Sequence, residues 1–165
     1  MRNLLIVTIL AAIVPTASLA DEAQNIAAVR GMIEAINQRD LDGLSEYVTD
    51  DVVRHSTATP GVVVTNLDEF RTFLINDIAT MPDSMQHIDI IFGSGDYVAV
   101  KARLIATQTG QMGPFPPSGK RVELVFMGIL RTENGKVAEI WVEWDNLGAL
   151  MQMGHIQAPG AESSE

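Results

Sequence analysis

Three acidic side chains and one tryptophan occupy every second position of a stretch near the end of the sequence: Glu139, Trp141, Glu143 and Asp145. Side chains two residues apart project from the same face of a β-strand. This face is open to two interpretations. Charged side chains are seldom buried unless they are paired, which favours a face in contact with solvent. In a pocket wall, however, an aspartate next to an indole would be desolvated, which raises the pKa of a carboxyl group and makes it a usable proton carrier.

A histidine stands in a second short stretch with strand character, residues 52–56. His55 shares its parity with Val53, so it either faces the same cavity or is a structural histidine bonded to backbone. The three histidines, His55, His87 and His155, do not have the spacing of metal ligands, and we expect no metal site. The sequence also lacks a Gly-x-Ser-x-Gly elbow, a P-loop and a dinucleotide fingerprint, so we expect neither a nucleophilic serine nor a nucleotide cofactor.

The charge balance narrows the choice of partners. The chain of 165 residues carries 21 acidic and 11 basic side chains and a formal net charge of −10. Such a surface repels nucleic acid and anionic lipid, so we expect neither as a partner, and it favours neutral or apolar ligands. Cysteine is absent, so stability must come from packing rather than from cross-links.

The first twenty residues have the pattern of a secretory signal. Arg2 precedes an almost unbroken apolar stretch, Leu4 to Val14, which is too short to span a bilayer, and Ser18-Leu19-Ala20 then offers small residues to a signal peptidase. Cleavage before Asp21 would leave 165 − 20 = 145 residues with a net charge of 10 − 21 = −11, since only Arg2 is lost. We therefore expect a periplasmic or secreted protein; an uncleaved N-terminal anchor is the alternative.

Helical and strand periodicities follow in separate blocks. Helical spacing of apolar residues predicts a helix over 22–38, a short helix after Asp40, and a helix capped by Asn66 that ends before Pro82. Period-two patterns then predict strands over 86–92, 97–109, 120–132 and 137–145, the last two joined by the hairpin signal Asn134-Gly135. A closing helical turn ends near Gly154.

Helices followed by an antiparallel meander predict an α+β domain. Its helices would pack on one face of a curved sheet over residues 21–154, followed by a disordered tail, 155–165. A twisted sheet covered by helices readily leaves a hollow between the two layers.

Six short motifs stand in a recognisable order and spacing: Asp50–His55, Gly95–Val100, Ala106–Gly110, Pro116–Arg121, Gly135–Trp141 and Asp145–Gly154. Together they resemble the SnoaL-like polyketide cyclases, also called ester cyclases, of the nuclear transport factor 2-like superfamily. The resemblance covers about residues 25–154. It implies a cone-shaped α+β barrel in which a curved sheet wraps around helices and encloses an apolar pocket, and it implies a homodimer.

The resemblance also implies a reaction without a cofactor. Family cyclases close a ring by intramolecular aldol condensation, in which an aspartate matching Asp145 takes a proton from a carbon flanked by carbonyl groups. Such a positioned proton carrier contributes about 10²–10⁴-fold to the rate. His55 matches a family histidine and joins Asp145 as the second expected catalytic residue.

The expected substrate-binding residues are Gln108, Trp141, Glu143 and Phe126. Trp141 matches a family tryptophan and would form a pocket wall, with Glu139 orienting its neighbours. Gln108 departs from the family, because many relatives have a histidine there in a Gly-Thr-His-x-Gly run. An amide can hydrogen-bond a carbonyl oxygen but does not titrate.

Three functions remain open from the sequence. The first is an enzyme that performs acid/base chemistry on a small apolar carbonyl compound, including isomerase or epoxide hydrolase steps in which Glu143 could assist. The second is a periplasmic binding protein for a small hydrophobic ligand, which the export signal and Gln108 favour. The third is an interaction protein whose sheet forms a dimer, with Ile140, Val142 and Trp144 as its surface.

Overall fold

The sheet is a five-stranded arch with the strand order β1-β5-β4-β3-β2. The computed structural model describes residues 17–157, and the predicted signal residues 1–16 and tail residues 158–165 lie outside this range. The strands are β1 (Val48–His55), β2 (Met85–Ser94), β3 (Tyr97–Thr107), β4 (Arg121–Glu133) and β5 (Lys136–Trp144). The predicted antiparallel meander is confirmed in β2 to β5. β1 adds a parallel edge beside β5, which the sequence analysis had left out of the sheet.

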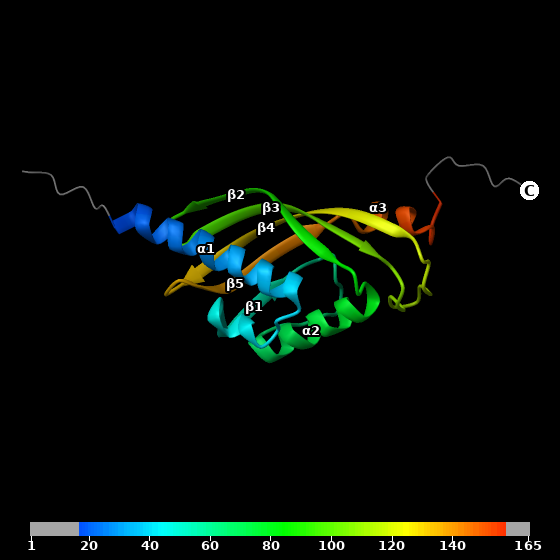
Figure 1. The fold of residues 1–165 in the computed structure, drawn as a ribbon, viewed down its shortest axis with the longest axis horizontal. Helices are drawn as coiled ribbons and strands as arrows, with labels where there is room; N and C mark the ends of the chain where they lie inside the picture. The colour runs from blue at the N-terminus through cyan, green and yellow to red at the C-terminus, as the bar shows by residue number, and fades with distance from the viewer. Residues whose placement is uncertain (1–16, 158–165) are drawn as a thin grey trace, which may run out of the picture.

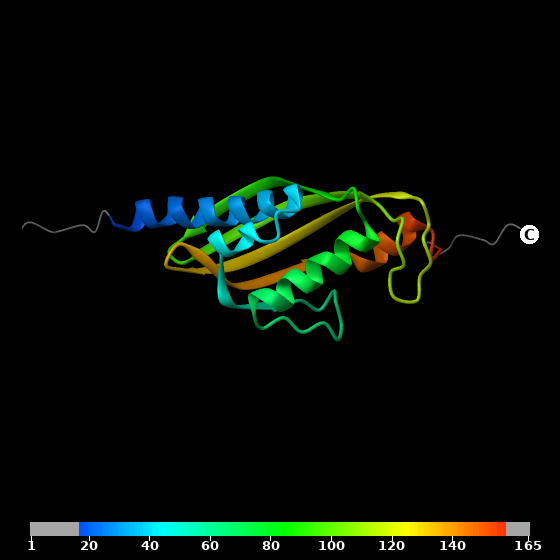
Figure 2. The same ribbon diagram turned by 60° about the horizontal axis from the view of Figure 1, so that its bottom comes forward.

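The helices lie on one side of this arch (Figure 1). They are α1 (Ala17–Gln38), the short 3-10 helix η1 (Gly43–Glu46), α2 (Leu67–Thr80) and α3 (Asn146–Met153). Figure 2 shows α1 and α2 on the same face of the sheet, toward the viewer, and α3 at the far end, beside the loop that joins β3 to β4. The predicted α+β fold, with helices packed on a curved sheet, is therefore confirmed. No helix among residues 17–157 combines the length and apolarity that a membrane crossing requires.

Local sequence signals explain where α2 and the last hairpin begin. The Asn66 side chain accepts a hydrogen bond from Glu69 N at 2.9 Å, and the Glu69 carboxylate accepts one from Thr65 N at 2.7 Å. These bonds satisfy backbone N–H groups that have no partner inside the helix. Asn134 and Gly135 both have positive φ, 52° and 75°, as a type I′ hairpin turn requires.

The core lies between the inner face of the sheet and the helices. Four inner residues of β3 are almost inaccessible, Val98, Val100, Ala102 and Ala106, and Leu104 on the same face is half-buried. The first three belong to one core cluster with side chains of α1 and α2 such as Val29, Ile33 and Phe70. A smaller second cluster of Val122, Ala149 and Met153 lies beneath α3.

A buried and an exposed leucine test how much the core contributes to the free energy of unfolding. Leu44 in η1 is fully buried, whereas Leu147 in α3 is 55 % exposed. We expect Leu44→Ala to lower the free energy of unfolding by about 2–5 kcal/mol, because it removes packed methyl groups and leaves a cavity. Leu147→Ala should change it by roughly 0.5 kcal/mol or less. Chemical denaturation of both variants measures the difference, and equal losses would contradict this description of the core.

Candidate active site

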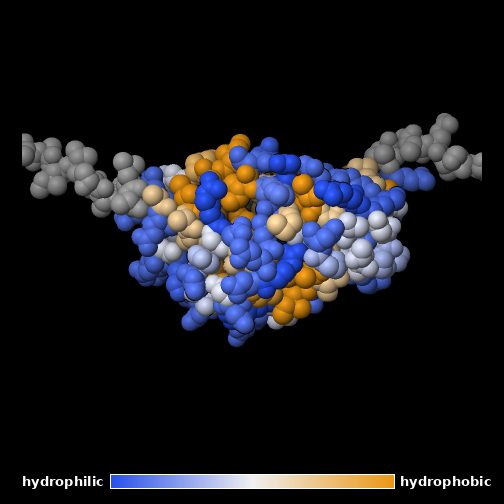
Figure 3. Space-filling model, viewed as in Figure 1, coloured by the Kyte–Doolittle hydropathy of each residue, from blue (hydrophilic) through white to orange (hydrophobic). Residues whose placement is uncertain are grey.

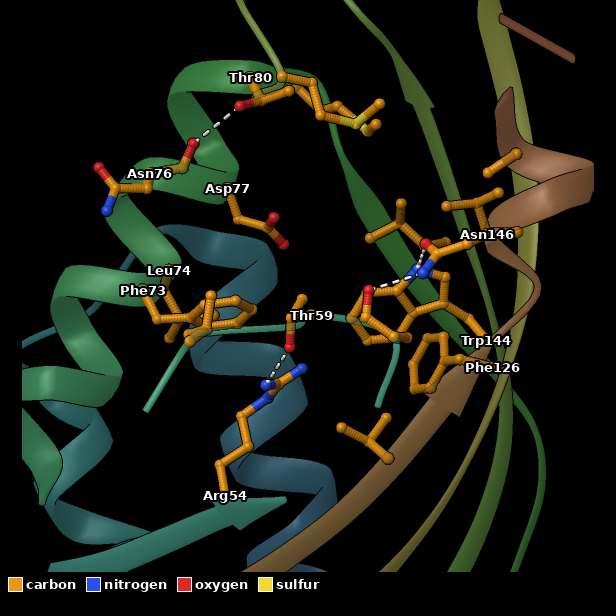
Figure 4. Close-up of a pocket in the computed structure, with 18 of the residues that line it drawn as sticks. Arg54, Thr59, Phe73, Leu74, Asn76, Asp77, Thr80, Phe126, Trp144 and Asn146 are labelled. Atoms are coloured by element: carbon orange, nitrogen blue, oxygen red, sulfur yellow. Dashed lines mark hydrogen bonds between the residues drawn. The ribbon is translucent and has the colours of Figure 1, made fainter. Parts of the chain in front are cut away.

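A cavity of about 1120 Å³ lies between the inner face of the sheet, α2 and α3. Its walls are largely apolar, with Phe73 from α2, Phe126 from β4 and Trp144 from β5 around the middle (Figure 4). The loop between β3 and β4 adds Met112 and Phe115 at one end. The hollow that the sequence analysis expected between the two layers is therefore present.

Two charged side chains enter this apolar space from opposite walls. Arg54 extends from β1 and Asp77 from α2, and Figure 4 shows both directed into the cavity. Nη1 of Arg54 donates a hydrogen bond to Thr59 Oγ1 at 2.9 Å. The guanidinium carbon lies 4.3 Å from the ring centre of Phe73 and 5.7 Å from that of Trp144. Cations in these positions are attracted by the faces of aromatic rings.

Desolvation changes the acid–base properties of both groups. Asp77 is exposed by accessible area because it borders the open cavity, yet the protein atoms around its carboxyl desolvate it. This desolvation raises its pKa, while the positive charge of Arg54 acts in the opposite direction. Desolvation lowers the pKa of Arg54, against the opposing charges of Asp77 and Glu143. A carboxyl group with a raised pKa that borders an apolar cavity has the properties expected of a proton carrier, which the sequence had suggested for Asp145.

Of the two interpretations of the face that carries Trp141 and Glu143, the structure agrees with the one in contact with solvent, and the expected placement of these two residues at the pocket is wrong. Ile140, Val142 and Trp144 line the cavity, so they are not the dimer surface that one hypothesis made of them. Trp141 and Glu143 point to the opposite, outer face, and Trp141 is 36 % exposed. The physical reason is that the helices cover the more apolar face of the strand, which leaves the acidic face to solvent.

His55 belongs to a cluster on that outer face. Its ring stacks on Trp141, with centroids 5.2 Å apart and planes 14° apart. Its Nε2 atom lies 2.8 Å from Glu139 Oε1, and Glu139 also accepts a hydrogen bond from Arg131 Nε at 3.1 Å. The bonds from His55 and Arg131 lower the pKa of Glu139. Among the expected catalytic residues, His55 is therefore outside the cavity.

Glu143 and Asp145 organise local backbone instead of facing the cavity. Glu143 accepts hydrogen bonds from Thr57 N, Thr57 Oγ1 and Ala58 N at 2.7–3.0 Å, which hold the loop after β1 and lower the pKa of Glu143. Asp145 is the N-cap of α3 and accepts a hydrogen bond from Gly148 N at 2.9 Å. The predicted position of Asp145 in a pocket wall is wrong, because the strand ends at Trp144 and the chain turns into α3.

Gln108 is a fully buried link within the loop between β3 and β4. Its Nε2 donates to Gly110 O and Pro116 O, at 3.1 and 3.0 Å. Its Oε1 accepts a hydrogen bond from Ser118 N at 3.2 Å and lies 2.8 Å from His155 Nε2. Through this contact His155, the residue after the expected end of the domain, packs on the loop between β3 and β4.

Phe126 is the one member of the expected substrate-binding set that lines the cavity. Arg54 and Asp77 were not among the expected residues, although both had a sequence signal. Arg54 shares its parity with Val52, which is fully buried, so it lies on the inner face of β1. Asp77 follows Phe70 by seven residues and Leu74 by three, which places it near the apolar stripe of α2. A charge on an apolar face is the pattern that would have identified both residues.

The fold and cavity define a class: an α+β protein whose curved sheet and helices enclose an apolar pocket. Within this class the chain belongs to the family described as SnoaL-like polyketide cyclases, whose model matches residues 26–153. The predicted family is thus confirmed, and with it the nuclear transport factor 2-like fold. A search of curated protein sequences returns no significant match.

Solved structures give the same result. IdmH from Streptomyces antibioticus, described as a candidate polyketide cyclase, is 26 % identical, with a TM-score of 0.71 over 79 % of this chain and 99 % of that one. A candidate SnoaL-like polyketide cyclase from Jannaschia sp. CCS1 is 21 % identical, with a TM-score of 0.73 over 82 % and 94 %. An LEH-like epoxide hydrolase from M. tuberculosis is 16 % identical, with a TM-score of 0.64 over 82 % and 92 %. The last two similarities concern the fold alone.

The raised pKa of Asp77 predicts a specific pH dependence of stability. The folded state retains the Asp77 proton above the ordinary pKa of 3.8, where the unfolded chain has lost it, so this group contributes less stability as the pH rises through that window. Asp77→Asn should remove this pH-dependent loss of stability, because asparagine does not titrate. We expect its unfolding temperature, relative to the unmodified protein, to increase from acidic to neutral pH in differential scanning calorimetry.

Asp83 is the matched control, because its pKa is lowered by hydrogen bonds from Thr107. Its contribution to stability is present above the ordinary pKa of the unfolded chain. This contribution is lost as the pH falls through the lowered pKa of the folded state. The relative unfolding temperature of Asp83→Asn should therefore decrease from acidic to neutral pH. A pH-independent difference for Asp77→Asn would show that its carboxyl is not perturbed by burial.

Proposed function

We propose that this protein binds a small, mostly apolar carbonyl compound in the cavity and moves a proton on it without a cofactor, with Asp77 as the proton carrier. The observation that supports this most is the approach of Asp77 and Arg54 to the same apolar space. Membership of the SnoaL-like polyketide cyclase family supports a cyclase-like function of this kind. The proposal transfers to Asp77 the role that the sequence analysis had given to Asp145.

In the proposed reaction the ionised Asp77 takes a proton from a carbon next to a carbonyl group. Negative charge then develops on the carbonyl oxygen, and the Arg54 cation stabilises it more strongly in this enclosed site than it would in water. The resulting enolate attacks a second carbonyl carbon of the same molecule, a new carbon–carbon bond closes the ring, and the proton on Asp77 passes to the new alkoxide oxygen. The apolar walls hold the two reacting carbons together.

Turnover by two aspartate variants tests this assignment. The first step is native mass spectrometry of protein purified from its own cells, to identify a molecule that is lost on denaturation. That compound, or otherwise a panel of β-dicarbonyl compounds and epoxides, then serves as substrate. We expect Asp77→Asn to lower kcat by about 10²-fold or more, since it removes the proton carrier, while Asp145→Asn keeps turnover because asparagine is an equally good helix cap.

The opposite result would return the catalytic role to Asp145. A ligand that both variants bind unchanged, with no turnover by the unmodified protein, would support the second candidate function, a periplasmic binding protein for a small hydrophobic ligand. The large, mainly apolar cavity is the observation that favours that candidate.

We also propose that the outer face of the sheet forms a homodimer. Apolar side chains on this face are exposed, and we call them the outer patch: Ile90, Phe92, Val125, Met127, Ile129 and Trp141. Strand pairing aligns Phe92, Ile129 and Trp141 in one row across the sheet. Ion pairs of Arg103 with Asp89 and of Arg131 with Glu139 surround it, as a polar rim surrounds an apolar interface. Figure 3 shows hydrophobic surface gathered at the top of the molecule, on the side of the sheet.

A charge in the centre of the outer patch should separate the dimer. Ile129→Asp would place a carboxylate in the interface, whereas the same change at Ile75, 55 % exposed on α2, leaves the sheet untouched. By size-exclusion chromatography with light scattering we expect a dimer for the unmodified protein and for Ile75→Asp, and a monomer for Ile129→Asp. A monomeric unmodified protein would refute the proposal.

The proposed place of action is the periplasm or the exterior of the cell, and the apolar stretch from Leu4 to Val14 supports it. Tertiary contacts of α1 are present just after the expected cleavage site: Glu22 accepts a hydrogen bond from Gly95 N, and Asn25 donates one to Gly95 O. Removal of residues 1–20 would therefore keep these two contacts. N-terminal sequencing of the protein from its own cells should begin at Asp21; a start at Met1 would contradict export by cleavage.

A further inference from the structure

The Arg54 guanidinium has more hydrogen-bond donors than the protein uses. It carries five N–H groups, and among the described residues its one hydrogen bond runs from Nη1 to Thr59 Oγ1. The remaining nitrogens are not sealed inside protein, because Thr49 Oγ1 is the one fully buried side-chain polar atom without a partner in residues 21–157. The unused donors of Arg54 therefore open into the cavity that it lines.

The two aromatic rings determine which part of Arg54 remains free. Phe73 covers the guanidinium at 4.3 Å, and Trp144 lies at 5.7 Å (Figure 4). Rings beside a planar group leave its edge, where the N–H bonds point, for a ligand. That edge matches the two oxygens of a carboxylate, which accepts two parallel N–H bonds in one plane.

The charge of Arg54 is not matched by an ion pair within the described part of the chain. Asp77 and Glu143 are the acidic groups that act on it electrostatically, yet neither lies within 4.0 Å of its nitrogens. Glu143 is already bound by Thr57 and Ala58. A buried cation without a partner is unfavourable, so an anionic ligand would stabilise this site.

The far end of the cavity is suited to an apolar body. Met81, Met112 and Met153 line it together with Leu124 and Leu150. Methionine side chains are flexible and polarisable, and they adapt to ligands of different shape. A volume of about 1120 Å³ lies slightly above the usual range for small-molecule sites, about 300–1,000 Å³.

We propose that the ligand of this cavity is an apolar carboxylic acid, whose free carboxylate binds the exposed edge of Arg54 and whose hydrocarbon body lies along Phe126 toward the methionine-lined end. The inference deepens the proposed function and rests on it for the choice of site. It assigns Arg54 as the residue that determines specificity, and it separates free acids from the corresponding esters and amides. Asp77 lines the same cavity, where it can take a proton from a carbon of the ligand that a ketone carbonyl activates, while the carboxylate serves only to bind Arg54.

Binding of matched acids and amides tests the proposal without a reaction. The probes are 1-naphthaleneacetate and 1-naphthaleneacetamide, and 4-phenylbutanoate and 4-phenylbutanamide, titrated into the full protein by isothermal calorimetry at neutral pH. Each pair has the same body and differs in charge. We expect each acid to bind about tenfold or more tightly than its amide, because hydrogen bonds to a charged group are the stronger kind.

Two arginine variants test whether the preference for the acid over the amide depends on Arg54. Arg54→Met should abolish the preference for the acid and leave amide binding nearly unchanged, which also shows that the cavity is intact. Arg131→Met makes the same charge change on the outer face, where Arg131 pairs with Glu139, and should retain the preference. If Arg54→Met does not fold, Arg54→Lys keeps the charge without the planar fork and should show a reduced preference.

Three results would overturn the proposal: equal binding of acid and amide by the unmodified protein, an acid preference that survives Arg54→Met, or no binding of either acid up to about 1 mM, the limit of weak specific binding. Failure of the proposed function looks different. An acid preference with no turnover on any substrate would leave the ligand class standing and remove the reaction. Turnover that depends on Asp77 but occurs only with neutral substrates would support the proposed reaction and refute the carboxylic acid as the ligand class.

Discussion

The arched sheet meets its helices over only part of its inner face, and the cavity is the space that remains. One hydrophobic cluster joins α1, α2 and the strands, and a second, smaller cluster lies under α3. Close packing normally leaves few voids larger than a water molecule in a protein interior. Here the curvature of β3, β4 and β5 keeps the two clusters apart, so that apolar side chains such as Phe126 and Leu124 face open space instead of a helix.

The same curvature places a charged pair where it can have the greatest effect. Arg54 and Asp77 would interact weakly at a solvent-exposed surface, because water screens charges. Inside the cavity, desolvation alters the pKa of both groups, and the aromatic rings of Phe73 and Trp144 limit the movement of the guanidinium. The fold thus places a desolvated acid and a permanent cation at one apolar cavity, as the proposed proton transfer and anion binding require.

On the outer face of the sheet, acidic and aromatic side chains have structural contacts instead of lining the cavity. His55, Trp141 and Glu139 pack against each other there, and Glu143 and Asp145 organise the loop after β1 and the start of α3. Their positions explain why residue types that suggest catalysis can stand outside the cavity. Acidic and aromatic side chains also cap helices, fix loops and make contact surfaces, and residue type alone does not distinguish these roles.

The sequence alone determined the element order, the strand alternation, the Asn66 cap, the Asn134-Gly135 turn and the family, because each depends on short stretches of chain or on their order. Sequence periodicity also separated the two faces of β5 correctly. Tertiary structure decided which face is covered and which residues meet. Arg54 and Asp77 lie on separate elements, a strand and a helix, and only the packing of α2 against the inner face of the sheet brings them to one cavity. Contacts between distant segments arise from how elements stack, and a linear pattern carries no information on the distance across that stack.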